Sequence, residues 1–144
     1  RKYPPELLNI IGSKKDSDIL TAGRYRIKIV NLDSLGFELT PQLISAGVDI
    51  FTQFGDTSIN ILLGFSYKDK KAIIKARSSD KAYPVSEELK KLFGGGGGKE
   101  ESGGLSISIR ELLNHLDVEK RYRNSREVKK GIIIALDNML EKFV

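Results

Sequence analysis

The sequence predicts an α/β or α+β fold in which helices flank one mixed β-sheet. Strand-like and helix-like stretches alternate along the 144 residues, and this interleaving is typical of that class. Residues 58–66 and 71–79 are apolar-rich runs joined by the polar turn 67–70, the pattern of a β-hairpin. A run of glycines also joins a helix-like stretch to a strand-like one. This length suits a single domain spanning 1–144.

The first half of the chain predicts a helix, a strand, a helix and a second strand before the hairpin. Thr40 is a suitable N-cap, Pro41 suits the first helical position, and Gly47 suggests where that helix ends. The alternation of apolar and polar residues over 24–30 indicates a half-buried strand. The expected elements are a helix over 6–11 ended by Gly12, and then 24–30 (strand), 40–47 (helix) and 48–51 (strand).

The second half predicts three helices and one strand. Ser86 is the expected cap of the first helix, and Glu87 and Glu88 lie in its first turn, where the helix dipole favours acids. The expected elements are 84–93 (helix), 105–109 (strand), 110–116 (helix) and about 125–143 (helix).

Three cations share one side of the first predicted strand. Arg24, Arg26 and Lys28 alternate with apolar residues, so they lie about 6.6–6.8 Å apart along one face. Such a row suits the phosphates of an extended nucleic-acid strand. Charged edge strands, protected against aggregation, show the same pattern, and we favour that interpretation here.

Composition narrows the range of functions. The chain carries 24 basic and 19 acidic residues, and this net charge of +5 favours polyanionic partners. It has no cysteine and one histidine, His115, which excludes thiolate and multi-histidine metal sites within these residues. We therefore expect no enzyme activity and no cofactor in this chain alone, with His115 a surface or half-buried helix residue. We also expect no membrane span and a cytoplasmic, intracellular location.

Glycine clusters in the second half of the chain. Seven of the 14 glycines lie within 94–104, five of them consecutively. One interpretation is a flexible linker. The other is a loop without Cβ atoms, whose backbone N–H groups can approach a phosphate closely. The position of the run between a helix and a strand favours the loop, because structureless linkers are unusual inside a domain.

This region resembles a known family. Val85–Ile107 contains a helix ending in Leu-Phe, five glycines, a short charged stretch, Gly-Gly and a strand. It resembles the signature of the DHH-associated domain, the C-terminal nucleic-acid-binding half of DHH phosphoesterases such as RecJ. The hairpin ending in Arg77-Ser78 also resembles the family's. The match is clearest over 59–109, and 110–144 is a C-terminal helical extension.

The resemblance implies a set of binding residues. The family's histidine is replaced here by Gly98, and its alanine pair by Glu101-Ser102. Arg77 would hold a backbone phosphate, the glycines would let the strand lie against the loop, and Lys99 would replace the histidine's contact. Lys75 lies two residues from Arg77, so the two cations share one strand face beside the glycine loop. The full candidate set is Lys75, Arg77, Ser78, Gly95, Gly96, Gly97, Gly98 and Lys99.

The departures from the family pattern suggest a domain that binds without cleaving. It resembles an archaeal RecJ-like replication protein that acts with GINS and the MCM helicase, and single-stranded DNA or RNA is the implied ligand. One alternative is the substrate-binding half of an active exonuclease or nanoRNase, whose upstream catalytic half would bind Mn or Mg. A second alternative is a protein-interaction module with a vestigial glycine loop.

A second basic stretch lies before the C-terminal helix. Residues 119–130 carry six basic and two acidic side chains, with Tyr122 among them as a candidate stacking platform. A solvated helical face fits the same pattern equally well. The candidate secondary patch consists of Arg121, Arg123, Arg126 and Lys130.

The chain ends in a strongly apolar stretch, 131–144. We expect most of it to be core. Any apolar surface left near Leu140, Phe143 and Val144 would mark a docking site for another domain or for a partner such as GINS.

Overall fold

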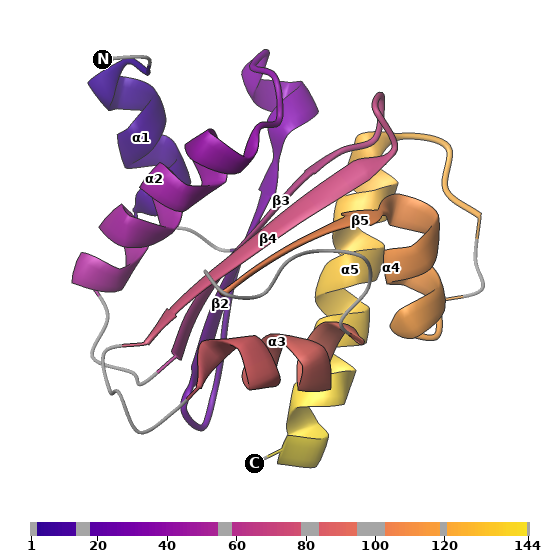
Figure 1. Ribbon diagram of the computed structural model, residues 1–144. Helices are drawn as coiled ribbons and strands as arrows, with labels where there is room; N and C mark the ends of the chain where they lie inside the picture. The colour runs from indigo at the N-terminus through magenta and orange to yellow at the C-terminus, as the bar shows by residue number, and fades with distance from the viewer. Residues whose placement is uncertain are drawn as a thin grey trace.

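The computed structural model describes residues 3–13, 18–54, 59–78, 84–94, 103–118 and 121–143. Five α-helices and five strands lie within these ranges (Figure 1). The helices are α1 (Pro5–Gly12), α2 (Pro41–Gln53), α3 (Val85–Phe93), α4 (Ile109–His115) and α5 (Ser125–Leu140). The strands are β1 (Ile19–Ala22), β2 (Tyr25–Asn31), β3 (Ile59–Ser66), β4 (Lys71–Ser78) and β5 (Gly104–Ser108). Short 3₁₀ helices cover Leu32–Leu35 and Glu141–Phe143.

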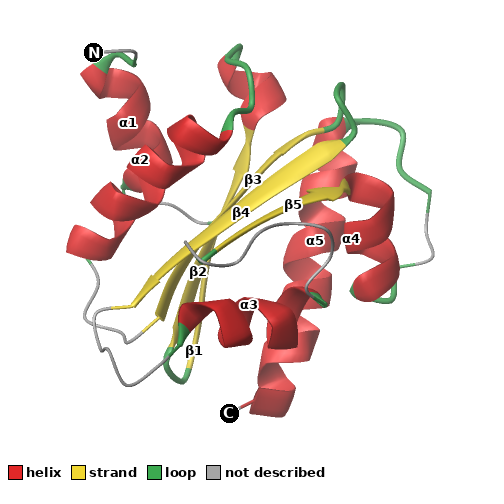
Figure 2. Cartoon of the chain, in the orientation of Figure 1, coloured by secondary structure: helices red, strands yellow, loops and turns green. Residues whose placement is uncertain are grey.

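One mixed sheet forms the centre of an α/β fold, as the sequence predicts. Its strand order is β1-β2-β3-β4-β5, with β2 and β3 parallel and the other neighbours antiparallel. The predicted hairpin is confirmed, because β3 pairs with β4 from Ile59↔Ser78 to Ser66↔Lys71. Helices α1 and α2 cover one face of the sheet, and α3, α4 and α5 cover the other (Figure 2).

Alternation along the strands divides the apolar side chains between two cores. In β3, for example, Ile61 and Leu63 face α3–α5, whereas Leu62 faces α1 and α2. The core on the α3–α5 side is the larger of the two. None of the helices in the described part of the chain combines the length and apolar character needed to cross a membrane.

Helix α2 is longer than predicted. Thr40 is its N-cap, with the hydroxyl oxygen accepting a 3.2 Å hydrogen bond from the N–H of Leu43, as expected. The predicted strand over 48–51 is wrong, since α2 continues through Gly47 to Gln53. A Cβ on Gly47 would lie 2.5 Å from Ile11 and 2.7 Å from Leu62. Glycine therefore permits close packing at this position and does not end the helix.

The edge-strand interpretation of the first cation row is also wrong, because β2 lies between β1 and β3. Arg26 is 6% exposed and Lys28 only 1%. The Lys28 ammonium donates 2.8 Å hydrogen bonds to the carbonyls of Ile10 and Ser13, at the end of α1. The Arg26 guanidinium donates to the carbonyl of Phe51, near the end of α2. Both cations thus satisfy carbonyls at helix C-termini, where positive charge is stabilising.

The third cation of the row, Arg24, belongs to a cluster on the other face of the sheet. It donates a 2.9 Å hydrogen bond to Glu88, which is 7% exposed and also accepts a 2.5 Å bond from the Tyr25 hydroxyl. The predicted capping role of Ser86 is wrong, because Pro84 occupies the N-cap and no side chain caps the helix. Through its bonds from Arg24 and Tyr25, Glu88 joins α3 to the start of β2.

The Glu88 carboxylate predicts a pH-dependent contribution to stability. Burial raises its pKa, but hydrogen bonds from Tyr25 and Arg24 outweigh burial and leave the pKa below its ordinary value of 4.5. The contribution is therefore present above about pH 4.5 and is lost as the pH falls through the lowered, folded-state value. At pH 7 we expect Glu88→Gln to lower the free energy of unfolding by about 1.5 kcal/mol. Urea unfolding from pH 7 to pH 3 should show this difference shrinking.

Glu87→Gln provides the matched control, because Glu87 is exposed in the same helical turn. This variant should keep the wild-type pH profile. If both variants have the wild-type free energy of unfolding at every pH, the Glu88 cluster does not contribute to stability as described.

The last described residues, after α5, lie close to the sheet. Leu140 is buried at the end of α5, so the docking surface expected there does not include it. The Phe143 ring lies 6.3 Å from that of Tyr25, and the Lys91 ammonium lies 5.1 Å from the centre of the Phe143 ring. Phe143 remains 37% exposed, and Val144 lies outside the described residues.

Candidate nucleic-acid interface

The predicted binding residues of β4 fall on two faces of the sheet. Lys75 and Arg77 lie on the same face as Ile73, which belongs to the core beneath α1 and α2. Ser78 lies on the opposite face, like Ala76 of the larger core. The structure therefore brings Lys75 and Arg77 together and separates Ser78 from them. Lys71, which is exposed, extends the cationic face toward the start of β4.

Lys75 lies across the neighbouring strand. It is paired in register with Gly104 of β5, where an added Cβ would lie 2.7 Å from the ammonium nitrogen and 2.8 Å from Cδ. Burial lowers the pKa of Lys75, and the positive charge of Arg77 lowers it further. A bound anion would favour the charged form of Lys75 and relieve its repulsion by Arg77.

Within the described ranges, Asp49 and the carbonyl of Ala76 bind the Arg77 guanidinium. Its Nε donates a 2.9 Å hydrogen bond to the Asp49 carboxylate on α2, and Nη1 donates a 2.9 Å bond to the carbonyl of Ala76. The Asp49 side chain is 58% exposed. An ion pair this accessible to solvent contributes little to stability, so a phosphate can compete for the guanidinium.

The described glycines at the two ends of the glycine cluster are held by close contacts. Gly94 caps α3 with a φ of +76°, and a Cβ there would lie 2.6 Å from Nδ1 of His115. Gly103 has a φ of +63°, and its carbonyl accepts a 2.8 Å bond from the N–H of Ala76. The chain therefore enters β5 directly beside β4. The predicted contacts of Gly95–Gly98 and Lys99 lie outside the described residues.

His115 is an exposed residue at the end of α4, as expected. Its Nε2 lies 3.1 Å from the carbonyl of Leu92, one of the last carbonyls of α3. This bond and the close approach of Gly94 give His115 a structural role. The described residues contain no group of three His, Cys, Asp or Glu side chains placed to hold a metal ion.

The second basic patch is separate from Lys75 and Arg77. Arg121 and Arg123 precede α5, whereas Arg126 and Lys130 lie one turn apart on it, and all four side chains are exposed. The backbone N–H of Arg123 donates a 2.8 Å bond to Glu127, so one acid already lies within this patch. Arg121 and Arg123 lie beside the β3–β4 turn, about 20 Å along β4 from Arg77, and α5 lies on the other side of the sheet (Figure 2).

Tyr122 does not stand free as a stacking platform. Its ring packs against Gly131 of α5, where an added Cβ would collide with it. Its backbone carbonyl accepts a 2.9 Å hydrogen bond from the Tyr67 hydroxyl at the β3–β4 turn. These contacts fix the segment that leads into α5.

The sequence does not indicate two members of the site, Asp49 and Gly104. Asp49 lies in the predicted strand 48–51, and the sequence does not fix the position of that strand relative to Arg77. Gly104 belongs to the glycine cluster, but only the β4–β5 register shows that it pairs with Lys75. No protein-family model matches the chain, and no match to a curated protein was found.

Proposed function

We propose that this chain is a non-catalytic, single-stranded nucleic-acid-binding domain of the DHH-associated type, with Lys75 and Arg77 as its main phosphate contacts. One observation carries the proposal: the two cations lie side by side on one sheet face, next to the strand that receives the glycine-rich segment. Alternate strand residues are about 6.6–6.8 Å apart, a spacing that suits successive phosphates of an extended strand.

The surroundings of the cations favour close approach of a polymer. The residues of β5 on this face are small, namely Gly104, Ser106 and Ser108, and Ser106 is exposed. A backbone can therefore lie against the sheet beside Lys75 without meeting a bulky side chain. Both cations contribute through counterion release, so binding should weaken strongly as salt concentration rises.

The cellular role follows from the family resemblance alone. It supports a place in a cytoplasmic RecJ-like replication protein that works with GINS and the MCM helicase. The alternative, the binding half of an active nuclease, is distinguished by the full reading frame. An upstream Asp-His-His segment with intact metal ligands would favour the nuclease.

Fluorescence anisotropy with a labelled oligo(dT) at two salt concentrations tests the proposed site. We expect Arg77→Ala and Lys75→Ala each to weaken binding by about 5–10-fold and to reduce the salt slope by about 1. Asp49→Asn should act in the opposite direction and strengthen binding by about 2–5-fold, because it removes the carboxylate that competes with phosphate for Arg77.

Lys68→Ala is the matched control, since Lys68 is an exposed lysine of the β3–β4 turn on the same hairpin. Its loss should leave affinity within about 2-fold of wild type. If Lys68→Ala and Arg77→Ala weaken oligo(dT) binding equally, the oligonucleotide is attracted only by the net positive charge of the chain. Affinity that is indifferent to salt would contradict the proposal outright.

A further inference from the structure

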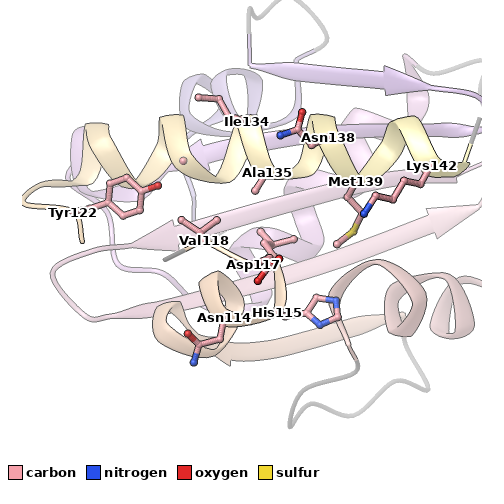
Figure 3. Close-up of a pocket in the computed structure, with 12 residues that line it drawn as sticks. Asn114, His115, Asp117, Val118, Tyr122, Ile134, Ala135, Asn138, Met139 and Lys142 are labelled. Carbon is pink, nitrogen blue, oxygen red and sulfur yellow. The ribbon is translucent and has the colours of Figure 1, made fainter. Parts of the chain in front are cut away.

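A groove runs between α4 and α5, on the opposite side of the sheet from Lys75 and Arg77. It consists of two adjoining hollows that share the lining residues Asn114, Val118 and Tyr122. Figure 3 shows Ala135 and Met139 projecting from α5 toward the segment that carries His115 and Val118. The packing of Tyr122 on Gly131 and its bond from Tyr67 fix one wall of this groove.

Apolar side chains lie along the groove between polar ones such as Asn114 and Asn138. Leu113 and Val118 contribute from α4 and the segment after it, and Ala135 and Met139 contribute from α5. All four are partly buried and pack against the larger core. Ile134, also on α5, is 63% exposed, the most exposed of the large apolar side chains in the described chain. Apolar surface of this kind, in a concave site between two helices, suits the apolar face of an amphipathic peptide.

Positive charge surrounds this apolar surface. The described lining residues include four lysines or arginines and one carboxylate, that of Asp117. Lys70, Arg110 and Arg121 lie at the β3–β4 turn end, and Lys142 lies at the other end. None of these four cations has an ion pair with a carboxylate in the described ranges. The potential therefore complements an acidic ligand.

The chemistry of the lining favours a peptide over a nucleic acid. A groove that binds a single strand through its bases offers exposed aromatic faces for stacking, whereas the Lys75–Arg77 site is proposed to contact phosphates. Tyr122 is packed on Gly131, the Tyr67 hydroxyl donates a hydrogen bond to the Tyr122 carbonyl, and the other apolar lining residues are aliphatic or thioether. We infer that the α4–α5 groove binds an acidic amphipathic segment of a partner protein, with its apolar side chains on Ala135 and Met139 and its carboxylates near Arg110, Arg121 and Lys142. This inference does not depend on the proposed nucleic-acid function.

A pair of synthetic peptides tests the inference. One is a peptide of roughly 15 residues with leucines at helical spacing and glutamates elsewhere, and the other has lysines in place of the glutamates. Labelled and titrated with the full chain, the glutamate peptide should bind at least about 10-fold more tightly than the lysine peptide. Ile134→Glu should weaken it by about 10-fold or more.

Ile10→Glu is the matched control, because Ile10 is 52% exposed on α1, on the other side of the sheet. It should leave peptide affinity unchanged, as should Arg77→Ala. Reversing the groove charge with Arg110→Glu and Arg121→Glu should transfer preference to the lysine peptide. The glutamate substitutions are all at exposed positions, so circular dichroism should show wild-type folding for each of them.

Three results would overturn the inference. The first is equal affinity for the two peptides, and the second is equal loss of peptide binding in Ile10→Glu and Ile134→Glu. The third is loss of oligo(dT) binding in Ile134→Glu, which would make the groove a nucleic-acid site. By contrast, failure of the Lys75–Arg77 site would appear only in the oligo(dT) titrations.

Discussion

Lys28→Ala is expected to lower the free energy of unfolding by about 3–4 kcal/mol. The side chain is 1% exposed, and its ammonium donates 2.8 Å hydrogen bonds to the carbonyls of Ile10 and Ser13. Alanine would leave a cavity where the lysine stem packs and would remove the donor from two carbonyls at the end of α1. Urea denaturation monitored by circular dichroism at pH 7 measures the loss.

Two further variants separate the causes. Lys28→Met keeps most of the stem volume and removes the charge. Its free energy of unfolding should fall by about 2 kcal/mol, because only the hydrogen bonds to the two carbonyls are lost. Lys71→Ala removes an exposed lysine from β4 and should stay within about 0.5 kcal/mol of wild type. Similar small effects at Lys28 and Lys71 would show that Lys28 does not anchor α1 to the sheet.

This buried lysine also shows where sequence-based prediction fails. Alternating cations and apolar residues over 24–30 predict a strand, and β2 confirms it. The pattern is the same for charges facing solvent and for charges facing the carbonyl ends of covering helices. The strand order decides between these two environments. β2 is an inner strand because β1 pairs with one of its edges and β3 pairs in parallel with the other. That pairing is a long-range contact with no local signal.

Local signals predicted the hairpin and the start of α2 well. The hairpin rests on two apolar runs around a polar turn, and the helix start rests on Thr40 and Pro41. The predicted end of α2 at Gly47 is wrong, because glycine is only an ambiguous stop signal. Glycine ends a helix through a left-handed backbone or permits close packing within one, and only the position of Ile11 shows which applies here.

The candidate site was only partly predictable. The resemblance to the family indicates Arg77, and strand alternation predicts that Lys75 shares its face, which the structure confirms. Strand alternation alone separates Ser78 from Arg77, so that division was available in the sequence. Asp49 was not, because its contact with Arg77 depends on how α2 crosses the sheet.

The second large expected effect concerns Gly103, the residue through which the chain enters β5. We expect Gly103→Ala to lower the free energy of unfolding by about 3 kcal/mol, measured by the same urea titration. Two causes contribute. The φ of +63° is strained for any residue with a Cβ, and that Cβ would lie 2.7 Å from Val85 and 2.9 Å from the carbonyl oxygen of Ala76.

Gly36 isolates the first of these causes. Its φ is +71°, but an added Cβ would meet nothing within 4 Å, so Gly36→Ala carries the backbone strain without the collision. We expect it to cost about 1 kcal/mol. The difference between the two variants then measures how firmly β4 and α3 hold the entry to β5. Equal losses would mean that Ala76 and Val85 give way at no cost, and that the strand beside Lys75 is not held in the position on which the proposed phosphate contacts depend.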